Sequence, residues 1–569
     1  MYGFIKRKRV PKMKWIPFDT PLEQHPKYGL IMYLSRSFLI DPILGHYLFA
    51  HGFDSEEKLS KFFYPDIIKD LHNPFLLNDM KKAIIRIVKA IKQKEKILIF
   101  GDYDVDGITS TTILFTALKR FKGDVSYRLP IRSEGYGLSA EAIKQVEPNT
   151  SLIITVDNGS SAHEALKVAK EKGIDVIVTD HHEILGEYPN CYAFINPKRH
   201  DSTYPFSELA GAGVAFKVVQ ALYQVAKRKF DRPFASYLEL ATLGTIADMM
   251  PIKDENRTIC KEGLHIMNIS PHPVFKKIFE KSYVKNVDSS TVGFTLGPIF
   301  NSCGRIDDPN IAVKILTSDS VSDKDVNFII NLNKNRKDLT NTQFLMADDQ
   351  IKTQELHKDK VIVVFDEFHN GIIGIIASKI TEKYKKPAIV ISHTGTGSAR
   401  SVNGTDFSIV NAIDSCSEQL IKYGGHQAAA GLSIKPEMDK VEMFRHSIQV
   451  NTQNLILADP VQRYIGELHI NQFSTELFDD INCIEPFGIN LPKPVFYCPP
   501  HLNSNCEVFG KSNNHLKLFY EKKHAISFFK GSLSNHLNQR KPFNFLYTTH
   551  CSKKRNFLIQ DIRLEGSAS

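Results

Sequence analysis

The chain has 569 residues, which is too long for one hydrophobic core and predicts two to four domains. Its apolar content of 42% is ordinary, no apolar stretch approaches the roughly 20 residues that span a bilayer, and no apolar run follows the basic start, so we expect a cytoplasmic protein. The net charge of +9 is compatible with binding of phosphate backbones. The eight cysteines include no Cys-x-x-Cys pair, so they give little support to a zinc ribbon or a disulfide framework.

Residues 1–90 are predicted to be mostly helical. Apolar side chains recur at helical spacing in residues 36–40 and 80–91, and the second segment leads directly into a short apolar run. We therefore expect an N-terminal helical region that continues into the next domain.

Three acidic clusters follow three short apolar runs in residues 91–320. The runs are Ile97–Phe100, Leu152–Ile154 and Val176–Val178, and the clusters are Asp102 to Asp106, Asp157-Asn158 and Asp180-His181-His182. Alternation of such runs with helical segments predicts an α/β domain with a parallel sheet. Ligands gather at the carboxyl ends of parallel strands, so we expect the three clusters to converge on one cleft.

Carboxylates crowded together with imidazoles can stay ionised only if bound cations neutralise their charge. Oxygen ligands with one or two histidines suit magnesium or manganese. Asp248, within an apolar stretch, would gain a partner from a shared metal. Taken singly, the motifs have ordinary alternatives, a strand and turn at Asp157 and a solvated loop at Asp180. The first cluster also opens like a calcium-binding EF-hand loop, but its twelfth position, Ile113, lacks the required glutamate.

In this order the motifs closely resemble the DHH phosphoesterases, and in particular the RecJ branch, the single-strand-specific 5′→3′ DNA exonucleases. The resemblance covers roughly residue 40 to the C-terminus. Supporting motifs lie in residues 132–138, 209–217, 297–305, 397–401 and 424–431.

This resemblance implies a site that holds two divalent cations, Mn²⁺ or Mg²⁺. The implied metal ligands are Asp102, Asp104, Asp106, Asp157, His181 and Asp248, with Asp157 as the bridge. The implied catalytic residues are His182 as a proton donor to the leaving 3′ oxygen, Asp180 as the group that orients an imidazole, and Asn301 and Arg305 as phosphate contacts. The implied substrate-binding residues are Arg132, Ser398, Arg400, Gly424, Gly425 and His426, of which Arg132, Ser398 and Arg400 would grip a terminal phosphate. Tight turns are the alternative for the glycine-rich segments.

The rest of the chain is predicted to form three further parts. Residues 321–357 lack proline and glycine and predict a long connector helix. Residues 358–452 predict a second, DHH-associated α/β domain. Residues 455–569 predict a small all-β domain, which the resemblance makes an oligonucleotide-binding (OB) barrel. Basic residues between Lys517 and Arg555 alternate there with seven aromatic residues, most of them expected in the core and one or two expected to be exposed platforms for bases.

The predicted function is a metal-dependent 5′→3′ exonuclease that releases 5′ mononucleotides from single-stranded DNA in DNA repair and recombination. Two alternatives stay open: a phosphodiesterase of the same family for short oligonucleotides or cyclic dinucleotides, and a non-catalytic relative that binds single strands. The added barrel argues against the first, and the intact acidic motifs argue against the second. The expected partner is single-stranded DNA, with single-strand-binding protein and a helicase as candidate protein partners, and we expect a monomer.

Overall fold

The computed structural model describes residues 13–184, 186–229, 231–455, 457–503, 505–510, 513–537, 539, 541–550 and 556–564. Contacts divide the chain into two compact units. The larger unit comprises residues 17–303, 308–329 and 463–569, and the smaller one is built mainly from residues 330–462. Within the described ranges, no helix is both long enough and apolar enough to span a membrane.

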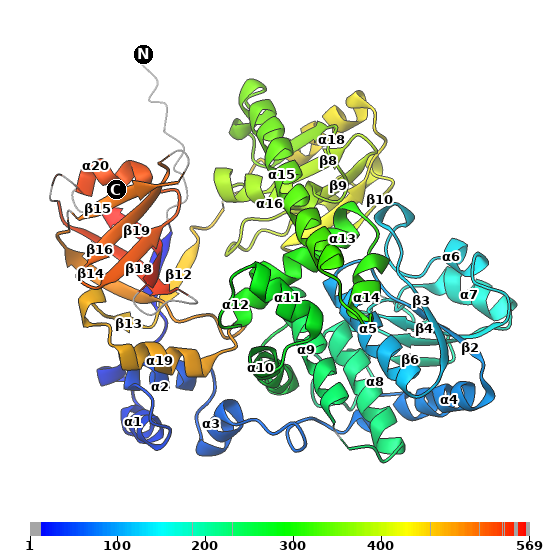
Figure 1. Cartoon of the computed structure of the whole chain (residues 1–569). Helices are drawn as coiled ribbons and strands as arrows, with labels where there is room; N and C mark the ends of the chain where they lie inside the picture. The colour runs from blue at the N-terminus through cyan, green and yellow to red at the C-terminus, as the bar shows by residue number, and fades with distance from the viewer. Residues whose placement is uncertain are drawn as a thin grey trace. The chain divides into compact units, whose positions relative to one another are not determined.

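A five-stranded parallel sheet forms the centre of the first α/β domain (Figure 1). The strand order is β3-β2-β4-β5-β6, with bounds Lys96–Phe100 (β2), Asp124–Arg128 (β3), Thr150–Val156 (β4), Asp175–Thr179 (β5) and Ala193–Ile195 (β6). The three apolar runs expected to be strands lie in β2, β4 and β5. Phe100 pairs with Thr155, which pairs with Val178, so the carboxyl ends of these strands are level. The three acidic clusters therefore begin at one edge of the sheet.

Helices pack against this sheet, and further helices follow it along the chain. Their bounds are Met80–Gln93 (α4), Val105–Arg120 (α5), Ala140–Lys144 (α6), His163–Glu171 (α7), Gly211–Val225 (α8), Arg232–Ala247 (α9), Asp254–Ile269 (α10), Pro273–Lys281 (α11), Ser289–Thr291 (α12), Gly297–Ile306 (α13) and Asn310–Leu316 (α14). Helix α5 contacts β2, β3 and β4, and α8 contacts β4 and β5. Asp248 is the residue that caps the C-terminus of α9.

The first three helices share one hydrophobic core with the C-terminal domain. They are α1 (Tyr28–Ser37), α2 (Pro42–Ala50) and α3 (Glu56–Phe63). The core combines residues such as Leu44 and Phe62 with residues such as Ile481 and Phe545. Helix α19 (Thr475–Ile484) lies beside α2 in Figure 1. The N-terminal region, expected to lead as a whole into the first α/β domain, thus divides: α1 to α3 join the C-terminal domain, and α4 packs near β6 and α8.

The C-terminal domain is built on a seven-stranded sheet in the order β13-β14-β18-β19-β17-β16-β15. The bounds are Gly466–Glu467 (β13), Phe496–His501 (β14), Cys506–Phe509 (β15), His515–Tyr520 (β16), Lys523–Ser527 (β17), Phe543–Thr549 (β18) and Asn556–Leu564 (β19), with α20 at Ser534–Leu537. A further pair, β1 (Lys14–Pro17) and β12 (Val461–Tyr464), forms a separate two-stranded sheet.

Most aromatic residues of this domain lie in its core, as expected. Tyr520, Phe543, Phe545 and Tyr547 are buried, and Phe519 is partly buried. Phe528 and Phe529 are 48% and 74% exposed, which confirms the expectation of one or two exposed rings. Four of the basic residues expected nearby lie outside the described residues: Arg540, Lys553, Lys554 and Arg555.

The smaller unit holds the second α/β domain, whose sheet has the order β10-β11-β9-β8-β7. The bounds are Ile362–Asp366 (β7), Ile373–Tyr384 (α16), Ala388–Ser392 (β8), Thr396–Arg400 (β9), Ile409–Asp414 (α17), Lys422–Gly425 (β10), Ala429–Ser433 (β11) and Met438–Asn451 (α18). Alternate residues of β7 enter two cores: Val363 and the partly buried Phe365 face α17 and α18, whereas Ile362 and Val364 face α16. This period of two is the expected pattern of a strand covered on both faces.

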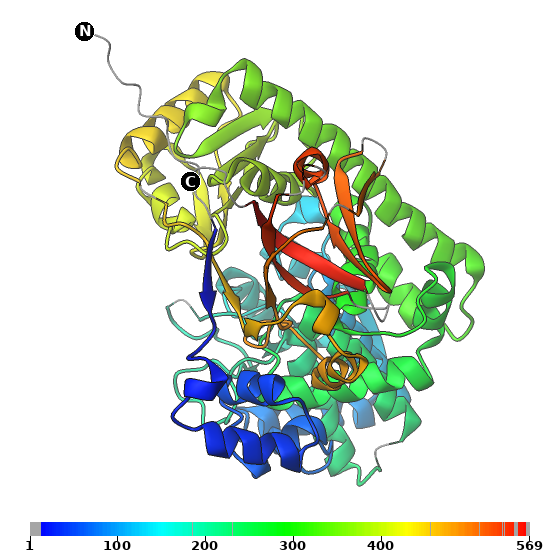
Figure 2. The ribbon, with the colours of Figure 1, turned by 90° about the vertical axis from the view of Figure 1, so that its left-hand side faces the viewer.

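The expected connector is one continuous helix, α15 (Asp323–Thr353), of 31 residues. At a rise of 1.5 Å per residue it is roughly 46 Å long, and Figure 2 shows it as a long green helix. The division between the two compact units falls within it, between Ile329 and Ile330. Helix α15 therefore carries the chain from the larger unit to the smaller one.

Candidate metal centre

All six predicted metal ligands lie in one cluster at the carboxyl edge of the five-stranded sheet. Three overlapping groups have ligand atoms within 4.8 Å of one another: Asp102, Asp104 and Asp157; Asp106, His181 and Asp248; and Asp157, His181 and His182. Asp157 and His181 each belong to two groups, so the groups form one continuous site.

The first acidic cluster is held by the turn between β2 and α5. Asp104 is the N-cap of α5, and its Oδ1 accepts a hydrogen bond from the backbone N–H of Gly107 at 3.1 Å. A side chain at position 107 would not fit, because its Cβ would lie 2.4 Å from the Asp102 carbonyl oxygen. The glycine of this motif thus allows the tight turn that brings Asp102 and Asp104 together.

Asp106 is anchored by the N-terminus of another helix. Its carboxylate accepts hydrogen bonds from the backbone N–H groups of Gly211 at 2.6 Å and Ala212 at 2.8 Å, in the first turn of α8. Free N–H groups and the helix dipole favour a negative charge at this position. The sequence motif containing Gly211 was recognised, but its role as a support for Asp106 was not predicted.

Asp157 and His181 form the centre of the cluster. Asp157 follows β4 in a left-handed conformation with φ of 62°, and a Cβ at position 211 would lie 2.6 Å from its carboxylate. Nε2 of His181 lies 3.1 Å from Oδ1 of Asp157 and 3.6 Å from a carboxylate oxygen of both Asp106 and Asp248. One imidazole is therefore surrounded by three carboxylates.

Burial and crowding shift the pKa values of this cluster strongly. Burial, with the neighbouring charge of Asp104, raises the pKa of Asp106 to about 7, and burial with Asp106 raises the pKa of Asp248 to about 8. The pKa of Asp157 lies well above its usual range for the same reasons. Burial and the charge of His182 lower the pKa of His181 to about 3, so its imidazole is neutral and offers a lone pair.

Several buried ligand atoms of the cluster lack a partner within the described part of the chain. Oδ2 of Asp102, Oδ1 of Asp157 and both ring nitrogens of His181 make no hydrogen bond there. Buried polar atoms are normally paired, and buried carboxylates without a cation are costly. The oxygen-rich donor set and these atoms fit a divalent cation of the magnesium or manganese type.

Asp180 and His182 form a hydrogen-bonded pair beside the cluster. Oδ1 of Asp180 lies 2.7 Å from Nδ1 of His182, and Oδ2 accepts from the backbone N–H of Ser160. Burial opposes charge on His182, but Asp180 outweighs it and raises the pKa of His182 to about 9. The hydroxyl of Tyr136 lies 3.2 Å from Nε2 of His182 and donates to the Asp157 carbonyl, a contact that the sequence did not predict.

Asn301 lies beside the first acidic cluster. Arg305 belongs to the smaller unit. Oδ1 of Asn301 accepts from the backbone N–H of Val105 at 3.3 Å, in the first turn of α5. Nη1 of Arg305 donates to the Gly371 carbonyl, in the segment before α16. Arg132, in the larger unit, has its guanidinium 4.4 Å from the ring centre of Tyr103.

The other predicted substrate-binding residues lie together on one side of the second sheet. Ser398 on β9 pairs with Gly431 on β11, which pairs with Gly424 on β10. Nη1 of Arg400 donates to Oγ of Ser398 at 3.1 Å. At Gly374, in the first turn of α16, a Cβ would lie 2.9 Å from Nη2 of Arg400. Gly374 therefore keeps this guanidinium open to the helix N-terminus, and this glycine was not predicted as a site residue.

Gly425 is the last residue of β10, and His426 begins the turn that follows. Gly425 has φ of 148°, and a Cβ there would lie 2.5 Å from the Ala429 carbonyl oxygen. The backbone N–H of His426 donates to that carbonyl, and its side chain is exposed. The tight-turn alternative fits the chain after Gly425 but not residues 397–400, which lie in strand β9; the turn leaves the exposed imidazole of His426 available for contacts.

Comparisons with known families match three parts of the chain. The models that match are the DHH family, N-terminal domain, over residues 96–245, the DHHA1 domain over residues 358–450, and the RecJ OB domain over residues 466–557. They agree with the α/β domain with a parallel sheet, the second α/β domain and the C-terminal sheet described above.

Two curated relatives cover most of the chain. The single-stranded-DNA-specific exonuclease RecJ of Haemophilus influenzae is 32% identical over 488 residues, which are 80% of this chain and 84% of that protein. The chain belongs to the RecJ family. RecJ of Bacillus subtilis is 34% identical over 527 residues, which are 90% of this chain, and the chain spans 66% of the length of that relative.

Solved RecJ structures share the fold. RecJ from Thermus thermophilus in complex with Mn²⁺ matches with a TM-score of 0.82 at 23% identity, over 97% of this chain and 79% of that one. The same RecJ in complex with Mg²⁺ matches with a TM-score of 0.74 at 22% identity, over 97% and 78% of the two chains. Related structures of the RecJ fold thus contain either of the two ions that the donor set here suits.

Proposed function

We propose that this chain is a metal-dependent 5′→3′ exonuclease that removes 5′ mononucleotides from single-stranded DNA in DNA repair and recombination. The observation that carries the proposal is the continuous cluster of carboxylates around His181, with buried ligand atoms that lack hydrogen bonds within the described residues. Membership of a family whose relatives are named single-stranded-DNA-specific exonucleases supports the substrate.

The cluster would hold two divalent cations, Mn²⁺ or Mg²⁺. The arrangement favours Asp102 and Asp104 on one side, and Asp106, His181 and Asp248 on the other, with Asp157 shared between the two. Two such ions, when bound, neutralise the non-bridging phosphate oxygens and make a water nucleophilic near neutral pH. Asp157 then has the role of keeping two like charges close together.

His182 is proposed to donate a proton from Nε2 to the 3′ oxygen that leaves the cleaved phosphate. Its raised pKa of about 9 keeps the imidazole protonated at neutral pH, because Asp180 holds Nδ1. Proton transfer would leave a 3′ hydroxyl on the released nucleotide and a neutral imidazole. Tyr136, within 3.2 Å of Nε2, would orient the ring from the other side.

Recognition of the 5′ end is proposed to rest on Ser398 and Arg400 of the second α/β domain. The guanidinium lies beside the hydroxyl and the first turn of α16, and we infer that the three together would bind an anion. Burial lowers the pKa of Arg400 but leaves the group charged at neutral pH. Gly424, Gly425 and His426, at the edge of the same sheet, would contact the adjacent phosphate.

The two alternatives are less well supported. Degradation of very short oligonucleotides or cyclic dinucleotides does not require a strand-binding domain, whereas residues 466–557 match the RecJ OB domain. A non-catalytic binding protein does not require an intact set of metal ligands, whereas the six proposed ligands lie in overlapping groups with ligand atoms within 4.8 Å of one another.

The proposal is tested with a single-stranded DNA and the corresponding blunt duplex, each incubated with protein and Mn²⁺. Release of mononucleotides from the single strand alone is the expected result. The matched control is Asp124→Asn, an exposed carboxylate at the opposite end of β3, which should cleave like the parent protein. Equal cleavage of both substrates, or products longer than mononucleotides, would contradict the proposed activity.

A further inference from the structure

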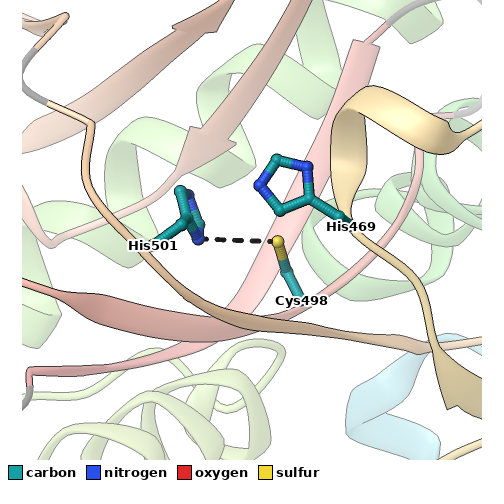
Figure 3. Close-up of side chains that lie close together, drawn as sticks. All are labelled: His469, Cys498 and His501. Carbon is teal, nitrogen blue, oxygen red and sulfur yellow. Dashed lines mark hydrogen bonds between the residues drawn. The ribbon is translucent and has the colours of Figure 1, made fainter.

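A second group of metal-ligating side chains lies in the C-terminal domain. His469, Cys498 and His501 have ligand atoms within 4.8 Å of one another. Figure 3 shows the Cys498 sulfur between the two imidazoles, and Sγ of Cys498 lies 3.8 Å from Nδ1 of His501. The ring centres of His469 and His501 are 4.9 Å apart. This group consists of sulfur and nitrogen donors, unlike the oxygen-rich cluster of the first α/β domain.

A β-bulge brings Cys498 and His501 together. Cys498 pairs with Phe545, and His501 pairs with Phe543, so three steps along β14 match two steps along β18. In a regular strand, residues three apart point to opposite faces of the sheet. The bulge changes this alternation and allows both side chains to face the same space, which is a known use of bulges at functional sites.

The chemistry of the three groups suits a borderline-soft cation. Cys498 is fully buried. One thiolate with two neutral imidazoles is a donor set typical of Zn²⁺, whereas Mg²⁺ and Mn²⁺ prefer oxygen.

Hydrogen bonds indicate which atoms of His501 and His469 would bind. Nδ1 of His501 donates to the Pro499 carbonyl at 2.8 Å, so its lone pair is on Nε2, which faces the Tyr520 hydroxyl at 2.7 Å. An N–H held by a backbone carbonyl is the usual support of a metal-binding imidazole. Nδ1 of His469 accepts the N–H of Asn471 at 3.2 Å, a long bond that a cation could replace.

Binding would require the three ligand atoms to move closer together. Zinc bonds of about 2.3 Å to sulfur and about 2.0 Å to nitrogen place tetrahedral ligand atoms about 3.3–3.6 Å apart. One ligand atom of each of the three side chains lies within 4.8 Å of the other two. The Tyr520 hydroxyl, which faces the Nε2 lone pair of His501, would have to turn aside for a cation to bind there.

We propose that His469, Cys498 and His501 bind one Zn²⁺-type cation that fastens the segment before α19 to strand β14. Binding would break the S–H bond of Cys498, release that proton to solvent and form a metal–sulfur bond. Burial raises the pKa of the Cys498 thiol to about 12, so the bound cation itself would have to drive the loss of this proton. Since α19 belongs to the core shared with α1 to α3, the cation would also stabilise that core.

The test uses the full chain, stripped of metal with a chelator and then kept in excess Mg²⁺ to occupy the acidic cluster. Co²⁺ is titrated in as the probe, because cobalt–thiolate bonds absorb in the near ultraviolet and carboxylate or imidazole complexes do not. We expect this absorption to saturate at one equivalent per chain, to disappear when Zn²⁺ is added, and to be lost in Cys498→Ser.

Two further variants complete the experiment. Cys483→Ser removes an exposed thiol of the same domain and should retain the absorption. His469→Asn changes a half-buried ligand and should weaken Co²⁺ binding by about 10-fold or more. Zn²⁺ should also raise the melting temperature of the parent protein and of Cys483→Ser. Absence of the absorption in the parent protein, or its persistence in Cys498→Ser, would overturn the proposal, and the first of these results does not depend on how any variant folds.

Discussion

Nε2 of His181 and Oδ1 of Asp157 face each other at 3.1 Å, and neither atom makes a hydrogen bond to the described residues. We expect Asp157→Ala to reduce cleavage by more than about 100-fold while the fold is kept, because the shared ligand of two cations is lost. Rates at saturating Mn²⁺, with circular dichroism as the folding check, measure this effect. Substantial turnover in this variant would remove Asp157 from the site.

Without metal, the acidic cluster should destabilise the protein as the pH rises. The pKa of Asp248 is raised to about 8 by burial and by Asp106, so the folded protein keeps a proton that the unfolded chain loses near pH 4. Stability from this group is complete below about pH 4 and is lost as the pH rises through about 8.

Melting of the chelator-treated protein between pH 5 and pH 8.5 measures this dependence. Asp248→Asn, which cannot ionise, should melt at higher temperatures than the parent at pH 8.5 and show a smaller difference at pH 5. An identical pH dependence in both proteins would show that Asp248 does not titrate in this range. Excess Mn²⁺ should restore the stability of the parent at pH 8.5, because the cation neutralises the ionised carboxylates.

Asn256 joins the two backbone segments that support Asp106 and Asp248. Its buried amide donates to the Glu208 carbonyl at 2.6 Å and to the Pro251 carbonyl at 3.0 Å. The first segment leads to Gly211, which binds Asp106, and the second follows Asp248. Asn256→Ala should therefore raise the Mn²⁺ concentration needed for half-maximal cleavage by about 10-fold or more.

The control for this prediction is on the same helix. Asn268 bridges the Leu264 and Val287 carbonyls with the same two-bond arrangement, away from the acidic cluster. Asn268→Ala should lower stability to a similar degree and leave the Mn²⁺ requirement unchanged. If Asn256→Ala and Asn268→Ala require similar Mn²⁺ concentrations, Asn256 has only a general structural role.

Recognition of a terminal phosphate can be tested at Arg400. Charge-assisted hydrogen bonds contribute roughly 1.5–3 kcal/mol each, so Arg400→Gln should lower the rate on 5′-phosphorylated strands by about 10-fold or more and leave the rate on 5′-hydroxyl strands nearly unchanged. Lys422→Gln, an exposed cation on β10 of the same sheet, is the control. If the parent protein cleaves both strands equally, Arg400 does not read the 5′ phosphate.

The exposed ring of Phe529 is predicted to stack on a base of a long strand. Stacking contributes about 1–3 kcal/mol per base, so Phe529→Ala should weaken binding of long single strands while a very short oligonucleotide is cleaved as before. Tyr283→Ala, at a 92% exposed ring of the larger unit, serves as the control. Unchanged affinity for long strands would exclude Phe529 as a platform.

Point variants test whether the C-terminal domain binds long strands better than removal of that domain does. Truncation near Asp459 would expose the apolar side chains of α1 to α3, such as Leu44 and Phe62, that pack against it. We expect the truncated chain to lose stability, so a loss of activity on every substrate would not separate strand capture from folding.

The sequence was sufficient where the signals are local. Apolar runs followed by acidic residues predicted β2, β4 and β5 and the convergence of Asp102, Asp157 and His181, because parallel strands end at one edge. A long stretch without proline or glycine predicted α15. Alternation of aromatic and basic residues predicted a largely aromatic core with few exposed rings.

The sequence was insufficient where distant segments cooperate. Nothing local to residues 34–63 signals a core shared with residues 470–562, because an amphipathic helix does not specify its partner. The amides of Gly211 that bind Asp106 and the bridging role of Asn256 are also long-range relationships. The bulge in β14 changes which residues share a face, so Cys498 and His501 did not appear as a pair in the strand pattern.

The most direct test of the central claim is digestion of one long single-stranded DNA labelled either at its 5′ end or at its 3′ end, with and without Mn²⁺, by the parent protein and by Asp157→Ala. We predict that the 5′ label is released at once as a mononucleotide, that the 3′ label stays on progressively shorter strands, and that both changes require Mn²⁺ and Asp157. Release of the 3′ label first, or equal digestion by Asp157→Ala, would contradict a metal-dependent 5′→3′ exonuclease centred on this cluster.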